Sequence, residues 1–225
     1  MNFSFLNQYY DYYLKGAVIT ILLAFFAVIF GTILGLLLSL LRRSKIKALS
    51  LVSKVYVEFV RGTPILVQIY IIYIGFPTLD GLPKIMDIPI GDLLVGVIAL
   101  ALNSAAYVSE IIRAGIEAVD KGQMEAARSL GMNQRLAMFE IIIPQAFKNI
   151  LPALGNEFIS VVKESSQVSV IGVAELMFKA GIVRGNTALG LEPIIVAAAV
   201  YFILTFTLTR GLGYVERRLK ASDIR

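Results

Sequence analysis

The sequence contains no cysteine and no histidine among its 225 residues. Their absence excludes disulfide bonds and any metal site that requires thiolate or imidazole ligands. It also excludes the Ser-His and Cys-His pairs that activate a nucleophile in many hydrolases. We therefore expect no metal site and no covalent catalysis, which makes an enzyme the less favoured class of protein.

Charged residues are also scarce, at 16% of the chain, whereas 57% of the residues are hydrophobic and the mean hydropathy is +0.77. A chain this apolar is not typical of a soluble domain. A bilayer core about 30 Å thick is crossed by roughly 20 mainly apolar helical residues. An all-α integral membrane protein with five transmembrane helices is predicted by the stretches at residues 16–41, 55–76, 92–112, 139–162 and 193–212.

The basic residues indicate how these helices are oriented. Residues 42–54 carry Arg42, Arg43, Lys45, Lys47 and Lys54 and no acid, a bias typical of cytoplasmic turns. Residues 77–91 carry one lysine against two aspartates. We therefore expect the N-terminus and residues 165–192 outside, and residues 113–138 and the C-terminus inside. This topology accounts for the net charge of +5 without nucleic-acid binding.

The first apolar stretch has no small-residue cleavage site near its end, so we expect it to remain as a helix and not to be removed as a signal peptide. Gly31, Gly35 and Ser39 recur at every fourth position, which permits another helix to approach closely. The first and fifth stretches have almost no ionisable residue between their ends. We expect them to face lipid or a second subunit.

The chain shows no internal repeat at a fixed period and no linker, so we expect a single membrane domain over residues 1–225. It contains no G-x-x-x-x-G-K-[ST] phosphate loop, so any nucleotide that drives the protein binds to another chain. Internal repeats are usual in ion-coupled secondary carriers, and their absence counts against that class.

A short polar segment, residues 121–130, lies between apolar stretches on the expected cytoplasmic side. Asp120 is placed to cap its free amides, and Gly131 to take the left-handed conformation that ends a helix. Met124, Ala127 and Leu130 follow helical spacing on one face. The sequence therefore predicts a short capped helix at this turn.

This segment resembles the cytoplasmic loop of ATP-binding cassette importers, whose pattern is E-A-A, three residues, G, nine residues, then I-x-L-P. Ile143 replaces the usual leucine, and the matching positions are Glu125, Ala126, Ala127, Gly131, Ile141 and Pro144. Residues 58–68, 103–119 and 161–176 resemble the polar amino-acid uptake branch, so the likeness extends from about residue 50 onward. It implies a coupling helix that docks into an ATPase subunit through Gln123, Glu125, Ala126, Ala127, Leu130 and Gly131. A solvated turn is the structural alternative.

The same resemblance implies the partners. They are two ATP-binding cassette ATPase subunits, a second permease subunit, an extracytoplasmic solute-binding protein and the amino-acid substrate. For the second permease we expect another copy of this chain. No cofactor is expected in the chain itself, because ATP and Mg belong to the ATPase subunits. The implied location is the inner membrane of a bacterial or archaeal cell, as a multi-pass protein.

Polar side chains within the apolar stretches are candidates for the substrate pathway, because a carboxylate at membrane depth is costly unless paired or hydrated. Pro64 disfavours helical geometry at Thr63, which predicts a break where backbone and Arg61 can meet an amino acid. Glu117 continues a polar stripe on the third helix. The full candidate set is Glu58, Arg61, Thr63, Gln68, Asn103, Tyr107, Glu110, Asn156, Glu157, Ser160 and Glu164. Structural ion pairs, Glu58 with Arg61 and Glu110 with Arg113, are the alternative.

These observations favour the membrane subunit of an ATP-driven importer that works by alternating access and has no covalent chemistry of its own. The carboxylates favour a polar, cationic amino acid as the substrate. An ion-coupled secondary carrier is the alternative function.

Overall fold

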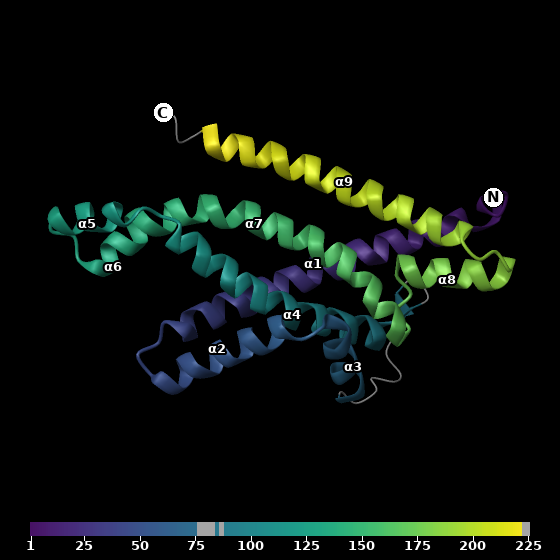
Figure 1. The fold of residues 1–225 in the computed structure, drawn as a ribbon, viewed down its shortest axis with the longest axis horizontal. Helices are drawn as coiled ribbons and strands as arrows, with labels where there is room; N and C mark the ends of the chain where they lie inside the picture. The colour runs from purple at the N-terminus through teal and green to yellow at the C-terminus, as the bar shows by residue number, and fades with distance from the viewer. Residues whose placement is uncertain (76–83, 86–87, 222–225) are drawn as a thin grey trace.

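The computed structural model describes residues 1–75, 84–85 and 88–221, and its elements are almost all helices (Figure 1). They are α1 (Leu6–Arg42), α2 (Lys47–Gly62), α3 (Ile65–Gly75), α4 (Ile90–Glu117), α5 (Lys121–Ser129), α6 (Gln134–Ala137), a π-helical turn η1 (Met138–Ile142), α7 (Ile143–Glu164), a 3-10 helix η2 (Ser165–Ile171), α8 (Leu176–Thr187) and α9 (Glu192–Ala221). A two-residue antiparallel pair, β1 (Lys84–Ile85) with β2 (Ile88–Pro89), precedes α4. The expected all-α fold is confirmed.

Three helices, α1, α4 and α9, are long and apolar enough to cross a membrane. Two bent pairs also qualify if each pair is counted as one span: α2 with α3 at 113°, and residues 134–171 with α8 at 50°. The described residues thus contain three to five candidate spans, and the expected five is the upper end of that range. The orientation of the spans stays a prediction.

Helices α1 and α4 pack closely against each other. A Cβ atom added at Gly35 would lie 2.8 Å from the Ala105 carbonyl oxygen, and one at Gly31 would lie 2.9 Å from the Ser104 Cβ. Glycine is therefore required by space at both positions, because any side chain would separate the two helices. The small residues identified in the sequence serve this contact within the chain.

The structure has helix in two places where the sequence did not predict it. The first helix was expected from residue 16 but begins at Leu6, because Tyr13 is buried and donates a 3.1 Å hydrogen bond to the Pro193 carbonyl oxygen. Residues 165–192, expected as a connection, contain α8, which packs between α1 and α9 through the buried residues Leu176 and Ala180. Tertiary contacts distant in sequence thus fix both segments. Part of the turn at residues 77–91 and residues 222–225 lie outside the described residues.

In Figure 1, α1, α4 and α7 run along the long axis of the molecule. The short helices α5 and α6 lie at one end of this bundle, and α8 lies at the other end beside the N-terminus. The polar segment of the loop is thereby held at the end of α4 and α7, away from the middle of the bundle.

Candidate substrate pathway and loop helix

The predicted break in the second span is present. Thr63 has extended backbone angles, φ −120° and ψ 147°, between α2 and α3. The side-chain amide of Gln68 donates to the carbonyl oxygens of Val60 and Thr63 at 2.8 and 3.1 Å. It also lies 2.9 Å from the Thr63 hydroxyl and accepts a 2.9 Å hydrogen bond from Asn103 on α4. Gln68 therefore satisfies carbonyls that the break leaves without helical partners, and anchors the break to α4.

Glu110 lies at the centre of a cluster of guanidinium groups. It accepts hydrogen bonds from Arg42 on α1 and from Arg113 at 2.8 Å, and its Oε2 lies 3.7 Å from Arg61 on α2. The Arg61 guanidinium also sits 5.7 Å from the centre of the Tyr107 ring, within cation–π range. With three cations around one carboxylate, Glu110 connects α1, α2 and α4 and is poorly suited to bind a cationic ligand.

This cluster decides between the two ion pairs that the sequence suggested. The pair of Glu110 with Arg113 is present. Glu58 is exposed on α2, and the described ion pair of Arg61 is with Glu110. Sequence reasoning assigned Arg42 to topology alone and missed its contact with Glu110, because the two residues are 68 positions apart.

Glu157 presents a different environment. It is 9% exposed on α7 and accepts a 2.7 Å hydrogen bond from the Ser104 hydroxyl on α4. Among the described residues, no arginine or lysine lies within ion-pair distance of it. A buried carboxylate without a cation is costly, which sets Glu157 apart from Glu110 with its three arginines. Ser104 was not among the predicted residues, although it adjoins Asn103.

The other candidates on α7 surround Glu157 unequally. Ser160 and Glu164 are half-buried and follow Glu157 at the i+3 and i+7 positions, which places them on the same face of the helix. Asn156 is exposed and donates a 3.1 Å hydrogen bond back to the Pro152 carbonyl oxygen of its own helix. The structure thus groups Glu157, Ser160 and Glu164, and it groups Thr63, Gln68 and Asn103 separately.

The loop helix α5 has the predicted caps. The Asp120 side chain accepts a 2.7 Å hydrogen bond from the Gly122 amide. At the other end, the Gly131 amide donates to the Arg128 carbonyl and the Met132 amide to the Ala127 carbonyl, at 3.0 and 3.1 Å. This pair of bonds is a Schellman motif, and Gly131 has the left-handed φ of 86° that the motif requires.

One face of α5 is packed and the other is open. Ala127 is buried, and Met124 packs on the buried cluster of Val119, Ile142 and Ala146. The Gln123 side chain accepts a 3.2 Å hydrogen bond from Gln145 on α7. The open face consists of Glu125, Ala126 and Leu130, and Leu130 is 85% exposed. This open face is apolar at Ala126 and Leu130 and charged at Glu125.

A further buried carboxylate, Glu175, was missed by sequence reasoning. It is 0% exposed and caps α8 by accepting hydrogen bonds from the Met177 and Phe178 amides at 2.9 and 2.8 Å. The Tyr201 hydroxyl on α9 donates a 2.6 Å hydrogen bond to it. These three donors stabilise the carboxylate. Glu175 therefore fixes α8 against α9, and only the Ncap position before α8 could have indicated it.

Comparisons with known proteins identify a family and relatives of the chain. Residues 27–221 match the family described as the binding-protein-dependent transport system inner membrane component. The chain is 42% identical over 223 residues to the arginine transport system permease protein ArtQ of Bacillus subtilis (strain 168), and the match covers 99% of each chain. It is 44% identical over 208 residues to the putative glutamine transport system permease protein GlnP of Rickettsia bellii (strain RML369-C), covering 92% of this chain and 93% of that protein.

Two solved structures show the same fold. One, titled as the crystal structure of an amino acid ABC transporter with histidines, has a TM-score of 0.87 and 49% identity, and covers 97% of this chain and 100% of that one. An inward-facing structure of the MetNI methionine ABC transporter has a TM-score of 0.73, covering 92% and 95%. At 17% identity, the second likeness concerns the fold alone.

Proposed function

The chain belongs to the family of binding-protein-dependent transport system inner membrane components, and from this premise we propose that it is the permease subunit of an ATP-binding cassette importer for cationic amino acids. The relatives named above carry the titles of arginine and glutamine permeases, and a solved relative is titled with histidines. The chain itself has no enzymatic role, because ATP hydrolysis takes place on separate ATPase subunits.

The observation that carries the cationic preference is the environment of Glu157. Its carboxylate is buried between α4 and α7 and has one hydrogen bond, from Ser104, but no cation among the described residues. A lysine or arginine side chain would supply the missing charge. Glu164 provides a second carboxylate two turns further along the same face of α7.

The remaining pathway candidates fit a supporting role around this site. The break at Thr63 interrupts the second candidate span, and backbone at such a break can meet the charged groups of an amino acid. Arg61 stays the candidate for the substrate carboxylate, because its link to Glu110 is long, at 3.7 Å, and its side chain is half exposed. We place the pathway where these helices meet a second permease subunit, which we propose is another copy of this chain.

Coupling to ATP hydrolysis is proposed to run through α5. Its open face of Glu125, Ala126 and Leu130 is presented for docking into a groove of the ATPase, while Met124 and Ala127 fix the helix to the base of α7. Motion of the ATPase would then reach α7, and with it Glu157, through the π-helical turn η1. This supports alternating access driven from the cytoplasmic side.

The experiment is uptake into vesicles that contain the chain with its ATPase subunit, with the solute-binding protein added outside. We expect arginine uptake that needs ATP inside and the binding protein outside, and that persists when ionophores collapse the ion gradients. Uptake that continues without ATP but stops with the ionophores would overturn the proposal in favour of an ion-coupled carrier. Vesicles with an ATPase that binds but cannot hydrolyse ATP are the matched control.

A further inference from the structure

A long apolar groove opens between α1, α4 and the start of α7. It has a volume of about 430 Å³, and its lining is apolar except for two hydroxyls and one charged group. Leu36, Ile116 and Phe147 line its length, and the charged group is Arg43, directly after the last residue of α1. An apolar slot with one cation at its end is complementary to a molecule with a hydrocarbon chain and an anionic head.

Arg43 is free to bind such a head. Its neighbour Arg42 donates to Glu110, whereas no described carboxylate lies within ion-pair distance of Arg43. Residues 42–54 contain no acidic residue that could compete. A guanidinium whose N–H donors are not engaged in an ion pair is well suited to bind a phosphate group.

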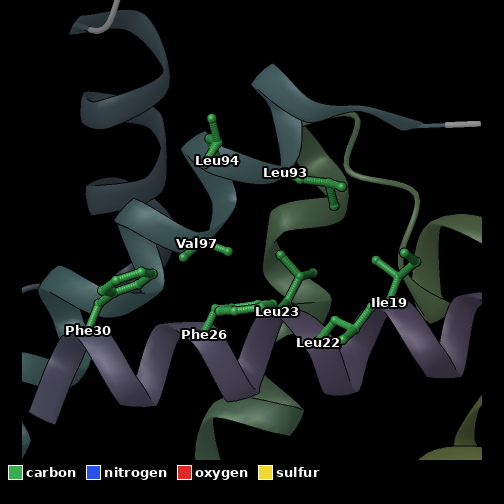
Figure 2. A pocket seen from close by; sticks show the side chains of 8 residues that line it. All are labelled: Ile19, Leu22, Leu23, Phe26, Phe30, Leu93, Leu94 and Val97. Carbon is green, nitrogen blue, oxygen red and sulfur yellow. The ribbon is translucent and has the colours of Figure 1, made fainter. Parts of the chain in front are cut away.

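A second groove on the same helix provides the contrast. It lies between α1 and α4 nearer the N-terminus of α1, and has a volume of about 280 Å³. Figure 2 shows Leu23 and Phe26 of α1 facing Leu93 and Val97 of α4 across it. All eight side chains that line it are apolar. Any acyl chain can occupy this second groove, so it gives no preference for one headgroup over another.

We propose that the groove between α1, α4 and α7 binds an anionic phospholipid of the cytoplasmic leaflet, with an acyl chain beside Leu36 and Phe147 and the headgroup phosphate on Arg43. The leaflet follows from the expected cytoplasmic position of the basic turn after α1. The same acyl chain packs against Met138 and Phe139 of the π-helical turn, which joins the loop helices to α7.

The test uses tryptophan fluorescence, because the chain has no tryptophan of its own. Phe147→Trp places a reporter in the proposed lipid site, and Phe26→Trp places one in the second groove. Both phenylalanines are partly open, at 55% and 44% exposed, so the larger indole is accommodated. The full-length permease, assembled with an ATPase subunit whose tryptophans have been replaced, is reconstituted in equal amounts of phosphatidylglycerol and phosphatidylcholine. Bromine, which quenches tryptophan on contact, is carried by the acyl chains of one lipid at a time.

We expect brominated phosphatidylglycerol to be enriched about fivefold over phosphatidylcholine beside Phe147→Trp, because one cation near an anionic headgroup attracts it. Arg43→Gln should abolish this enrichment. Lys45→Gln, which removes a cation of the same turn outside the groove, should leave it unchanged, and Phe26→Trp should report no enrichment.

Three results would overturn the proposal. One is equal quenching by the two lipids beside Phe147→Trp. Another is an enrichment that survives Arg43→Gln or is lost equally with Lys45→Gln, which would show a general surface-charge effect. The third is no quenching by either lipid, which would show that a second subunit covers the groove.

Discussion

The Ser104 hydroxyl on α4 donates a 2.7 Å hydrogen bond to the buried carboxylate of Glu157 on α7. This bond joins the two helices on which most of the polar pathway candidates lie. Among the described residues, no arginine or lysine forms an ion pair with this carboxyl group. The neighbouring carboxylate Glu110 differs, because arginines from three helices already surround it. Of the two, we therefore propose Glu157 as the group that binds a cationic substrate.

Glu157→Gln should therefore separate cationic from neutral substrates. Loss of one partner of a desolvated charge pair typically costs about 2–5 kcal/mol, so arginine uptake should fall at least tenfold. Glutamine uptake should fall far less, because the change is nearly isosteric. Ser104→Ala is the matched control, since it removes the hydrogen bond but keeps the charge, and it should affect both substrates equally. Uptake would be measured in vesicles at equal saturation of the binding protein. Equal losses for both substrates in Glu157→Gln would leave Glu157 a structural carboxylate.

The second prediction concerns Gly131 at the C-terminal end of α5. Gly131 has a φ of 86° and no atom within 4 Å of an added Cβ, so Gly131→Ala strains only the backbone. The left-handed conformation costs a residue with a side chain roughly 1–2 kcal/mol, which should shift or fray the end of α5. We expect substrate-stimulated ATP hydrolysis and uptake to fall, with unchanged insertion of the permease.

Gly181→Ala is the matched control for that change. Gly181 also has no atom within 4 Å of an added Cβ, but it lies inside α8 and has no positive φ. Alanine should be tolerated or slightly stabilising there. Full substrate-stimulated activity in both variants would reject a docking role for the end of α5.

Local signals explain which parts of the structure could be predicted from the sequence. Pro64, Asp120 and Gly131 each act on the backbone within a few residues, so the helix break and both caps of α5 were predicted correctly. The spacing of Gly31 and Gly35 indicated a close helix contact, but not that the contact is with α4.

Contacts between distant residues explain what could not be predicted. Glu110 is reached by Arg42 across 68 positions, and Glu175 by Tyr201 across 26 positions. Tyr13 extends α1 through a bond to Pro193, 180 positions away. No periodicity or motif encodes such pairs, because they depend on how the helices cross.

The orientation of the spans is tested by single cysteines in a chain that has none. Lys47, Gln123 and Asn186 are all exposed, so cysteine should react at each position without disturbing the fold. A reagent that cannot cross the membrane should label Asn186→Cys in intact cells. It should label Lys47→Cys and Gln123→Cys only after the membrane is opened. Labelling of Gln123→Cys from outside would contradict the expected orientation and place α5 away from any cytoplasmic ATPase.

The last prediction concerns Gln68 and Asn103, which are both buried and joined by a 2.9 Å hydrogen bond. Gln68→Met keeps the length of the side chain but leaves the Asn103 amide and the Thr63 carbonyl without this partner. An unsatisfied buried polar group costs about 1–3 kcal/mol, so the thermal unfolding temperature of the purified transporter should fall. Asn103→Leu alone should cost less, because Gln68 keeps its bonds to Val60 and Thr63.

A double-mutant cycle then isolates the link between the break and α4. With Asn103 already replaced, Gln68→Met no longer leaves an amide on α4 without a hydrogen-bond partner. The double variant should therefore be more stable than the sum of the two single losses indicates. Hydrogen exchange at the amides of residues 65–68 should rise in every variant that lacks Gln68, since the break loses its anchor. Strictly additive losses, with exchange unchanged at these amides, would show that the Gln68 side chain does not hold the break against α4.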